Sequence, residues 1–239
     1  MRILRFCIGL LLIPGSMGLT RTVVASVGAS TTLVLAGGSR PFMAMAIGLV
    51  AAVIMFWALP RPVRLYVLAH ELTHALSGAL LGARVSSLRV GAQSGHVKLS
   101  QSNWLIALAP YFFPLYTFIV ILAYYGGLIF FDLRPYTMAW LGLVGFTLGF
   151  HLTFTIQAIA QGQGDIRAYG RFFSLSMVYF VNLLVIGLVL LLVAPLAGHG
   201  QALTFPELCQ RFLADQAFVW HAAGRTLRAV AGWVGGRIL

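Results

Sequence analysis

Long apolar runs separated by short polar breaks make up most of this 239-residue chain. Most of the runs approach or exceed the roughly 20 residues that a helix needs to cross the hydrocarbon of a bilayer. The first run is longer than one ordinary span and contains Pro14, Gly15 and Arg21, so it forms either one bent helix or two short helices. The pattern predicts an all-α polytopic membrane protein with about six transmembrane helices, or seven, in residues 3–36, 41–59, 65–82, 104–131, 136–160 and 172–196.

Two segments depart from this series. Residues 85–90 and 96–99 alternate roughly in polarity on either side of a Gly-rich turn, which predicts a short β-hairpin at the membrane surface, with a plain polar loop as the alternative. From Leu203 onward, aromatic and aliphatic residues alternate with arginines, which is typical of one or two helices lying in the membrane interface. We therefore divide the chain into N-terminal membrane segments (1–59), a membrane core (60–196) and a C-terminal interfacial tail (197–239).

Composition agrees with membrane insertion. The chain is 60% hydrophobic and 9% charged, whereas soluble domains carry about a quarter charged residues. We expect a multi-pass protein of the bacterial inner membrane. The formal net charge of +11 comes from arginines scattered between apolar runs, so the expected partners are anionic lipid headgroups and not nucleic acid. The two cysteines, Cys7 and Cys209, provide neither a disulfide framework nor a thiolate zinc site.

The strongest chemical signal is the sequence His70-Glu71-Leu72-Thr73-His74 within the apolar run 65–82. Residues four apart share one face of a helix, so both imidazoles can face one metal ion. Glu71 is close enough to polarise a water held by that metal, which is the arrangement of zinc hydrolases. Ionisable groups are costly within a bilayer, so such a group is expected to be functional. The motif predicts Zn²⁺ bound by His70 and His74, with Glu71 as the catalytic base.

A catalytic zinc takes a third protein ligand. Asp165 is favoured because it follows Gln161-Gly162-Gln163-Gly164, where two glycines let the backbone bend and bring a carboxylate inward. Gln161 is expected to support the ligands by hydrogen bonds. His151, in the middle of a predicted span, is the alternative ligand or a supporting group, and Asn182 is a weaker polar candidate. The remaining acidic and histidine candidates are His96, Asp132, His199, Glu207, Asp215 and His221.

Two neighbouring stretches leave alternatives open. Residues 109–114 contain two prolines and interrupt any straight helix, so this stretch either dips towards the site or is a simple kink. Asp165 either faces the metal or pairs with Arg167 in an ordinary loop. If every apolar run crosses the membrane once, His70 and Asp165 start from opposite sides. Asp165 must then fold inward, or residues 104–131 must re-enter.

These residues resemble the site-2 protease family of intramembrane zinc metalloproteases. The likeness covers roughly residues 60–190 and rests on the motif helix, the Gly-rich strands that follow it, the polytopic frame and a later Gly-Asp pair. In that family a downstream Asp, usually within Leu-Asp-Gly, completes the metal site; here the order is Gly164-Asp165-Ile166. No PDZ-like insertion is present, which resembles the compact members or the uncharacterised relatives of the family. The resemblance implies hydrolysis of peptide bonds in membrane-embedded protein substrates.

Two other classes of function fit parts of the sequence. One is a non-catalytic, protease-like membrane scaffold or chaperone with a relict site, which predicts protein without metal or metal without hydrolysis. The other is a small metal or proton transporter that uses His70, His74, His151 and Asp165, which predicts ion flux in proteoliposomes. So few charged residues hardly make a continuous polar path, which favours the hydrolase over the transporter.

Overall fold

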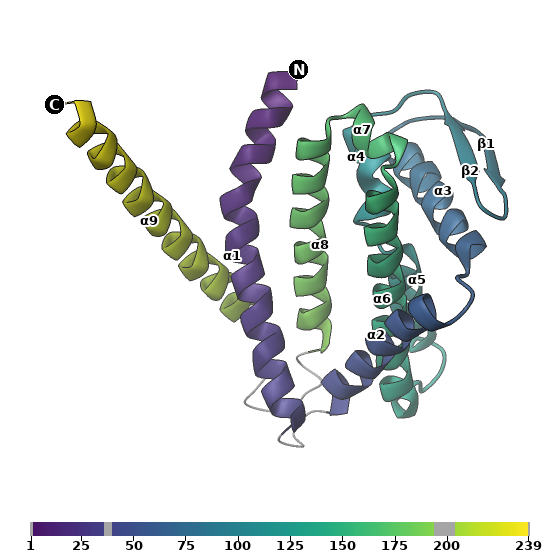
Figure 1. The fold of residues 1–239 in the computed structure, drawn as a ribbon. Coiled ribbons are helices and arrows are strands. Elements are labelled where there is room, and N and C mark those ends of the chain that lie inside the picture. The colour runs from purple at the N-terminus through teal and green to yellow at the C-terminus, as the bar shows by residue number, and fades with distance from the viewer. Residues whose placement is uncertain (1, 36–39, 194–203, 239) are drawn as a thin grey trace.

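The computed structural model describes residues 2–35, 40–193 and 204–238, and shows a bundle of helices with one small sheet (Figure 1). The predicted helical class and the hairpin after the motif helix are both confirmed. In chain order the elements are α1 (Arg2–Leu35), α2 (Arg40–Ala58), α3 (Val63–Leu80), β1 (Val85–Val90), β2 (Gly95–Leu99), α4 (Trp104–Leu108), the 3₁₀ turn η1 (Ala109–Tyr111), α5 (Leu115–Gly127), η2 (Arg134–Tyr136), α6 (Thr137–Gln161), α7 (Gly164–Ala168), α8 (Arg171–Val193) and α9 (Phe205–Ile238).

Four of the described helices are long and apolar enough to cross a membrane: α1, α2, α6 and α8. A fifth span results if α4 with η1 and α5, which meet at a bend of 76°, are counted together. The expected number of about six is therefore too high for the described residues. Part of the reason is that α3 contains Arg64, Glu71 and the two histidines, which make it too polar to count as a candidate membrane span. The first run forms one helix with Pro14 inside it, not two helices.

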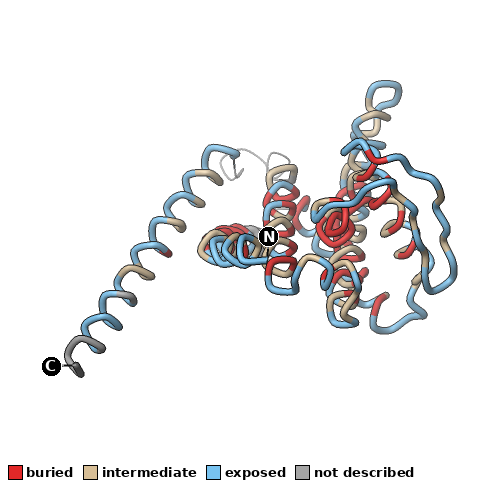
Figure 2. Tube along the Cα trace, turned by 90° about the horizontal axis from the view of Figure 1, so that it is seen from above, coloured by how far each residue is buried: buried red, intermediate tan, exposed pale blue. Residues whose placement is uncertain are grey.

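The core of the bundle lies where α2 packs on α6 and α1 on α8. Glycines allow the first pair to approach closely, since a Cβ on Gly149 of α6 would lie 2.9 Å from Cβ of Ala52 on α2. Leu141 and Val144 of α6 are fully buried there. Figure 2 shows buried residues gathered where the helices meet. Large apolar side chains remain exposed on the outer faces of these helices, as expected for surfaces that contact lipid.

The hairpin lies against α3 (Figure 1). Its strands are antiparallel, with Leu88 opposite Val97 and Val90 opposite Gly95. Gly95 allows the close approach to α3, because a Cβ there would lie 2.7 Å from Cγ of Glu71 and 2.8 Å from Cγ1 of Val67. The hairpin is therefore part of the wall around the motif.

The C-terminal segment is one long helix, α9, not two. Near its start it contacts α1 through Asp215, which accepts hydrogen bonds of 2.9 Å from both Arg21 and Thr22. Gln216 also donates to the main-chain oxygen of Gly15 at 3.1 Å. Beyond these contacts α9 extends away from the bundle (Figures 1 and 2). Its predicted place in a membrane interface stays a prediction.

The directions of α3 and α6 and the position of α7 decide how Asp165 reaches the histidines. Helices α3 and α6 end on the same side of the bundle, because α5 returns the chain between them (Figure 1). The short helix α7 then lies beside α4 at that end. Asp165 on α7 is thereby brought to the helix that carries the histidines.

Candidate metal centre

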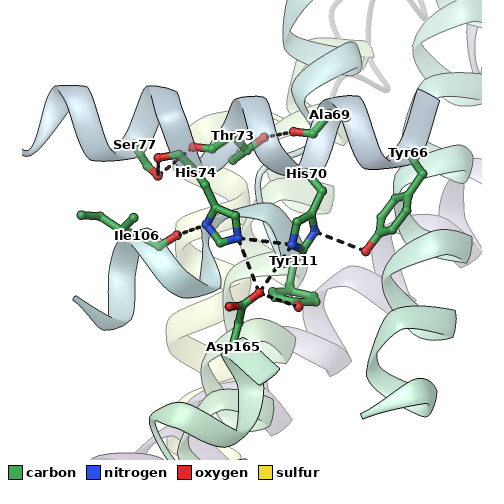
Figure 3. Close-up of polar contacts among 9 residues, drawn as sticks. All are labelled: Tyr66, Ala69, His70, Thr73, His74, Ser77, Ile106, Tyr111 and Asp165. Carbon is green, nitrogen blue, oxygen red and sulfur yellow. Dashed lines mark hydrogen bonds and ion pairs between the residues drawn. The ribbon is translucent and has the colours of Figure 1, made fainter. Parts of the chain in front are cut away.

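Three donor atoms from α3 and α7 converge on one point (Figure 3). Nε2 of His70 lies 3.2 Å from Nε2 of His74. Oδ2 of Asp165 lies 3.4 Å from the first of these nitrogens and 3.5 Å from the second. Within the described residues, this is the one group of three His, Cys, Asp or Glu side chains close enough to hold a metal ion.

Hydrogen bonds on the far side of each ring leave the Nε2 atoms available as ligands. Nδ1 of His74 lies 2.9 Å from the main-chain oxygen of Ile106. A carbonyl can only accept, so this Nδ1 carries the hydrogen and neutral His74 has its lone pair on Nε2. Nδ1 of His70 lies 3.3 Å from the hydroxyl oxygen of Tyr66. When this Nδ1 carries the hydrogen and donates to that oxygen, neutral His70 also has its lone pair on Nε2. Metal-binding histidines are fixed in this way by a partner behind the ring.

The spacing of the three atoms fits a tetrahedral zinc site. Ligand atoms at bond lengths of about 2.0–2.1 Å in tetrahedral geometry lie about 3.3 Å apart. The observed separations of 3.2, 3.4 and 3.5 Å are close to that value. Two imidazole nitrogens and one carboxylate oxygen are a donor set that zinc accepts, and three ligands leave a fourth position open for water or substrate.

Asp165 is held by a residue from the break between α4 and α5. The hydroxyl of Tyr111 donates to Oδ2 of Asp165 at 3.1 Å, and its ring packs edge-on against His70 with 5.3 Å between ring centroids. Asn182 of α8 fixes this turn by donating to the main-chain oxygen of Tyr111 at 2.8 Å. Of the two alternatives for residues 109–114, the structure therefore shows the stretch reaching the site.

The two carboxylates of the site have opposite electrostatic surroundings. Burial raises the pKa of Glu71 above its usual value, and the two nearby histidines only partly oppose this effect. Burial would also raise the pKa of Asp165, but in the metal-free protein hydrogen bonds from the Nε2–H groups of His70 and His74 hold it well below the usual range. A carboxylate that stays ionised suits a metal ligand, whereas a carboxylate with a raised pKa suits a proton acceptor.

The candidate metal centre borders two adjoining cavities. One, of about 440 Å³, is lined by the three ligand residues, Glu71 and part of β2. The other, of about 370 Å³, continues past Glu71 between the hairpin and α6. His70, Glu71, Gly95 and Gln163 border both cavities. Glu71 therefore lies between the two cavities, one of which contains the converging donor atoms and is bordered by β2.

Other candidates from the sequence lie elsewhere. His151 is behind the site, where its Nε2 lies 3.3 Å from Oδ1 of Asn182, so it does not join the ligand group. Gln161 lines the second cavity. Arg167 lies against Gly162, while Asp165 contacts the histidines and Tyr111, so the alternative pairing of Asp165 with Arg167 is not formed. Of the rest, His96 lines the first cavity, Asp132, Glu207, Asp215 and His221 are outside the ligand group, and His199 lies outside the described residues.

Sequence reasoning missed three supports of the site: Tyr66, Tyr111 and the carbonyl of Ile106. Tyr66 precedes His70 by one helical turn, and that spacing was a usable signal. Tyr111 lies within a stretch already suspected of approaching the site. The Ile106 carbonyl is 32 residues from His74, a contact that only the fold creates.

Comparisons with models of protein families, with curated proteins and with solved structures found no match. The resemblance to the site-2 protease family therefore stays a prediction based on the motif and its surroundings. A function for this chain must be argued from the geometry of the metal centre and its cavities.

Proposed function

We propose that this chain is a membrane-embedded zinc metalloprotease. The observation that carries the proposal is the convergence of three donor atoms at separations of 3.2–3.5 Å, close to the edges of a zinc tetrahedron. The partners behind the rings strengthen it, because they direct both imidazole Nε2 atoms to the same point. A simple ion pair between Asp165 and one histidine would not require the second imidazole to converge as well.

The residues present suit hydrolysis of a peptide bond. His70, His74 and Asp165 would hold the zinc, which when bound lowers the pKa of a water and polarises a carbonyl oxygen. Glu71 accepts a proton from the attacking water and passes it to the nitrogen of the leaving amine. Its burial raises its pKa, and a more basic carboxylate is a better proton acceptor.

The cavities suit an extended peptide as substrate. β1 pairs with one edge of β2, and residues 95–97 of β2 line the cavity of the metal centre. A substrate segment paired along β2 would pass Glu71 with its carbonyls exposed. The carbonyls of a helical substrate are hydrogen-bonded within the helix, so such a segment must unwind before cleavage.

A membrane location is supported by the four or five helices that are long and apolar enough to span a bilayer. The bundle that carries the site is built from these helices. We therefore propose membrane-embedded proteins as the substrate class, with the bacterial inner membrane as the proposed location.

Zinc content and peptide cleavage test the proposal together. Wild-type protein, His74→Ala and Glu71→Gln are purified in detergent and analysed for zinc. They are then reconstituted in vesicles with apolar helical peptides containing Gly-Pro breaks, and cleavage is followed by mass spectrometry. Glu207→Gln, at an exposed glutamate at the start of α9, is the matched control. We expect about one zinc per wild-type chain and none in His74→Ala.

The Glu71→Gln variant separates the candidate functions. For a protease it should keep the zinc and cleave at least about 100-fold more slowly, because the amide cannot accept the water's proton. Zinc without any cleavage by wild type would favour the scaffold. No stoichiometric metal in wild type, with His74→Ala indistinguishable from it, would reject the metal centre.

A further inference from the structure

A cavity lined by arginines lies at the end of the bundle where α1 and α8 begin. It has a volume of about 430 Å³, and its four basic side chains come from three helices. Figure 1 shows the start of α1, the start of α8 and α7 at this same end. The basic residues are Arg2 and Arg5 of α1, Arg167 of α7 and Arg171 of α8.

No carboxylate balances these charges within the described lining of the cavity. The chain has five acidic residues, and their contacts lie elsewhere. Glu71 and Asp165 belong to the metal centre, and Asp215 pairs with Arg21. Asp132 accepts from the main chain of Arg134, and Glu207 from that of Thr204. The positive charges of four arginines that line one cavity repel each other, so an anion would stabilise the arrangement.

The walls of this cavity are held in place by packing. The guanidinium of Arg5 lies over the ring of Tyr169, 4.8 Å from its centroid, which links α1 to the segment after α7. Four residues on, α1 and α8 nearly touch, because a Cβ on Gly9 would lie 2.9 Å from Cε1 of Phe172. The flat, forked donor groups of arginine match the oxygens of a phosphate group. A cavity that is lined by four arginines and has packed walls is therefore suited to a phosphate group.

The surroundings favour a lipid as the source of that phosphate. Both α1 and α8 are candidate membrane spans, and both start at the cavity. The rings of Phe6 and Phe172 lie at its apolar side, 5.1 Å apart, and both are exposed. A phospholipid headgroup lies at the level where spans begin, so its acyl chains could follow the exposed apolar faces of these two helices.

We propose that this cavity binds the phosphate of an anionic phospholipid and that the bound headgroup links α1 to α7 and α8. The lipid neutralises guanidinium groups from all three helices at once, so its binding stabilises the folded bundle. This site is separate from the metal centre, and the proposal stands whether or not the chain is a protease.

A titration in neutral detergent tests the proposal. Phosphatidylglycerol, phosphatidylcholine or inorganic phosphate is added to the full chain. Bound lipid is counted by native mass spectrometry, and the midpoint of thermal unfolding is recorded. The test variant is Arg2→Gln/Arg5→Gln/Arg171→Gln. The matched control is Arg211→Gln/Arg225→Gln/Arg228→Gln on α9, which removes the same charge from another part of the chain.

Wild type should retain one phosphatidylglycerol and unfold at a higher temperature when it is bound. Each arginine near a lipid headgroup contributes about fivefold in affinity, so the test variant should bind about a hundredfold more weakly. The control should stay near wild type, and phosphatidylcholine should bind less tightly.

Three results would overturn the proposal. Equal losses in both triple variants would mean general attraction between charges. Complete displacement of the lipid by millimolar inorganic phosphate would mean a site for free anions. Wild type that retains no lipid would exclude the site altogether. If the triple variant does not fold, the single variants Arg2→Gln and Arg171→Gln replace it, and each should weaken binding about fivefold.

Discussion

Replacing Tyr111 with Phe removes one hydroxyl group from the metal centre and leaves the aromatic ring in place. That hydroxyl donates to Oδ2 of Asp165 at 3.1 Å. The same oxygen lies 3.4 and 3.5 Å from the two imidazole nitrogens, so the hydroxyl aims the proposed ligand atom. The ring also packs edge-on against His70, and Phe retains this contact. The substitution therefore isolates the contribution of one hydrogen bond.

Two independent magnitudes give the expected loss. A hydrogen bond to a charged acceptor contributes about 1.5–3 kcal/mol. Loss of a group that supports a metal ligand typically lowers metal affinity about 10- to 100-fold, which corresponds to about 1.4–2.8 kcal/mol. Tyr111 is 0% exposed, so water does not readily replace its hydroxyl. We expect Tyr111→Phe to bind zinc about 10- to 100-fold more weakly than wild type.

The assay is competition for zinc between the protein and a chromophoric chelator in detergent. Tyr116→Phe is the matched control, because its hydroxyl bonds the main-chain oxygen of Leu65 at 2.8 Å and not a metal-facing atom. Thermal unfolding of each metal-free protein checks that the fold is intact. If Tyr111→Phe and Tyr116→Phe bind zinc equally well, Tyr111 does not position Asp165 and our assignment of its role is wrong.

Three further outcomes test other parts of the site. Asp165→Ala should lose zinc and His151→Ala should keep it, and elemental analysis of the two side by side decides which is the third ligand. Gly95→Ala should slow cleavage at unchanged zinc content, because a Cβ there would lie 2.7 Å from Cγ of Glu71 and displace that side chain. An unchanged cleavage rate would show that the hairpin can shift away from Glu71 without affecting it. Burial lowers the pKa of His74, but its hydrogen bond to Asp165 raises it overall, whereas the pKa of Asp165 is lowered. In the metal-free protein the ion pair between protonated His74 and ionised Asp165 is therefore present at pH values between the two pKa values. It is lost as the pH rises above the pKa of His74, because the imidazole then loses its charge. The difference in thermal stability between wild type and Asp165→Asn should be larger at about pH 5 than at about pH 9, and the opposite order would contradict this pairing.

The parts of the site that were predictable from sequence are those that depend on local geometry. His70 and His74 face the same way because they are one turn apart on a single helix, and any helix would do this. Asp165 was favoured because flanking glycines permit a bend, and Gly162 indeed has a φ of 70° at the end of α6. Neither argument required knowledge of how the helices pack.

The misjudged features depend on polarity and on packing between distant segments. The run 65–82 was counted as a span from its length, but the same charged and imidazole groups that make the motif also make α3 too polar. The pairing of Arg21 with Asp215 joins residues 194 apart, and nothing local to either residue indicates it. Apolar length alone therefore overestimates the number of spans where a helix carries a polar site.

The break between α4 and α5 explains how one short stretch supports two of the proposed ligands. In a continuous helix the carbonyl of Ile106 would accept from the main-chain N–H four residues later, but that residue is Pro110, which has no N–H. The carbonyl is left free, and it accepts from Nδ1 of His74. Ile106 and Tyr111 would also point about 140° apart on a straight helix. Tyr111 instead lies in the 3₁₀ turn that follows α4, and from there its hydroxyl reaches Asp165 while the carbonyl of Ile106 reaches His74. Pro110 is thus the sequence feature that frees the Ile106 carbonyl and lies in the turn that carries Tyr111.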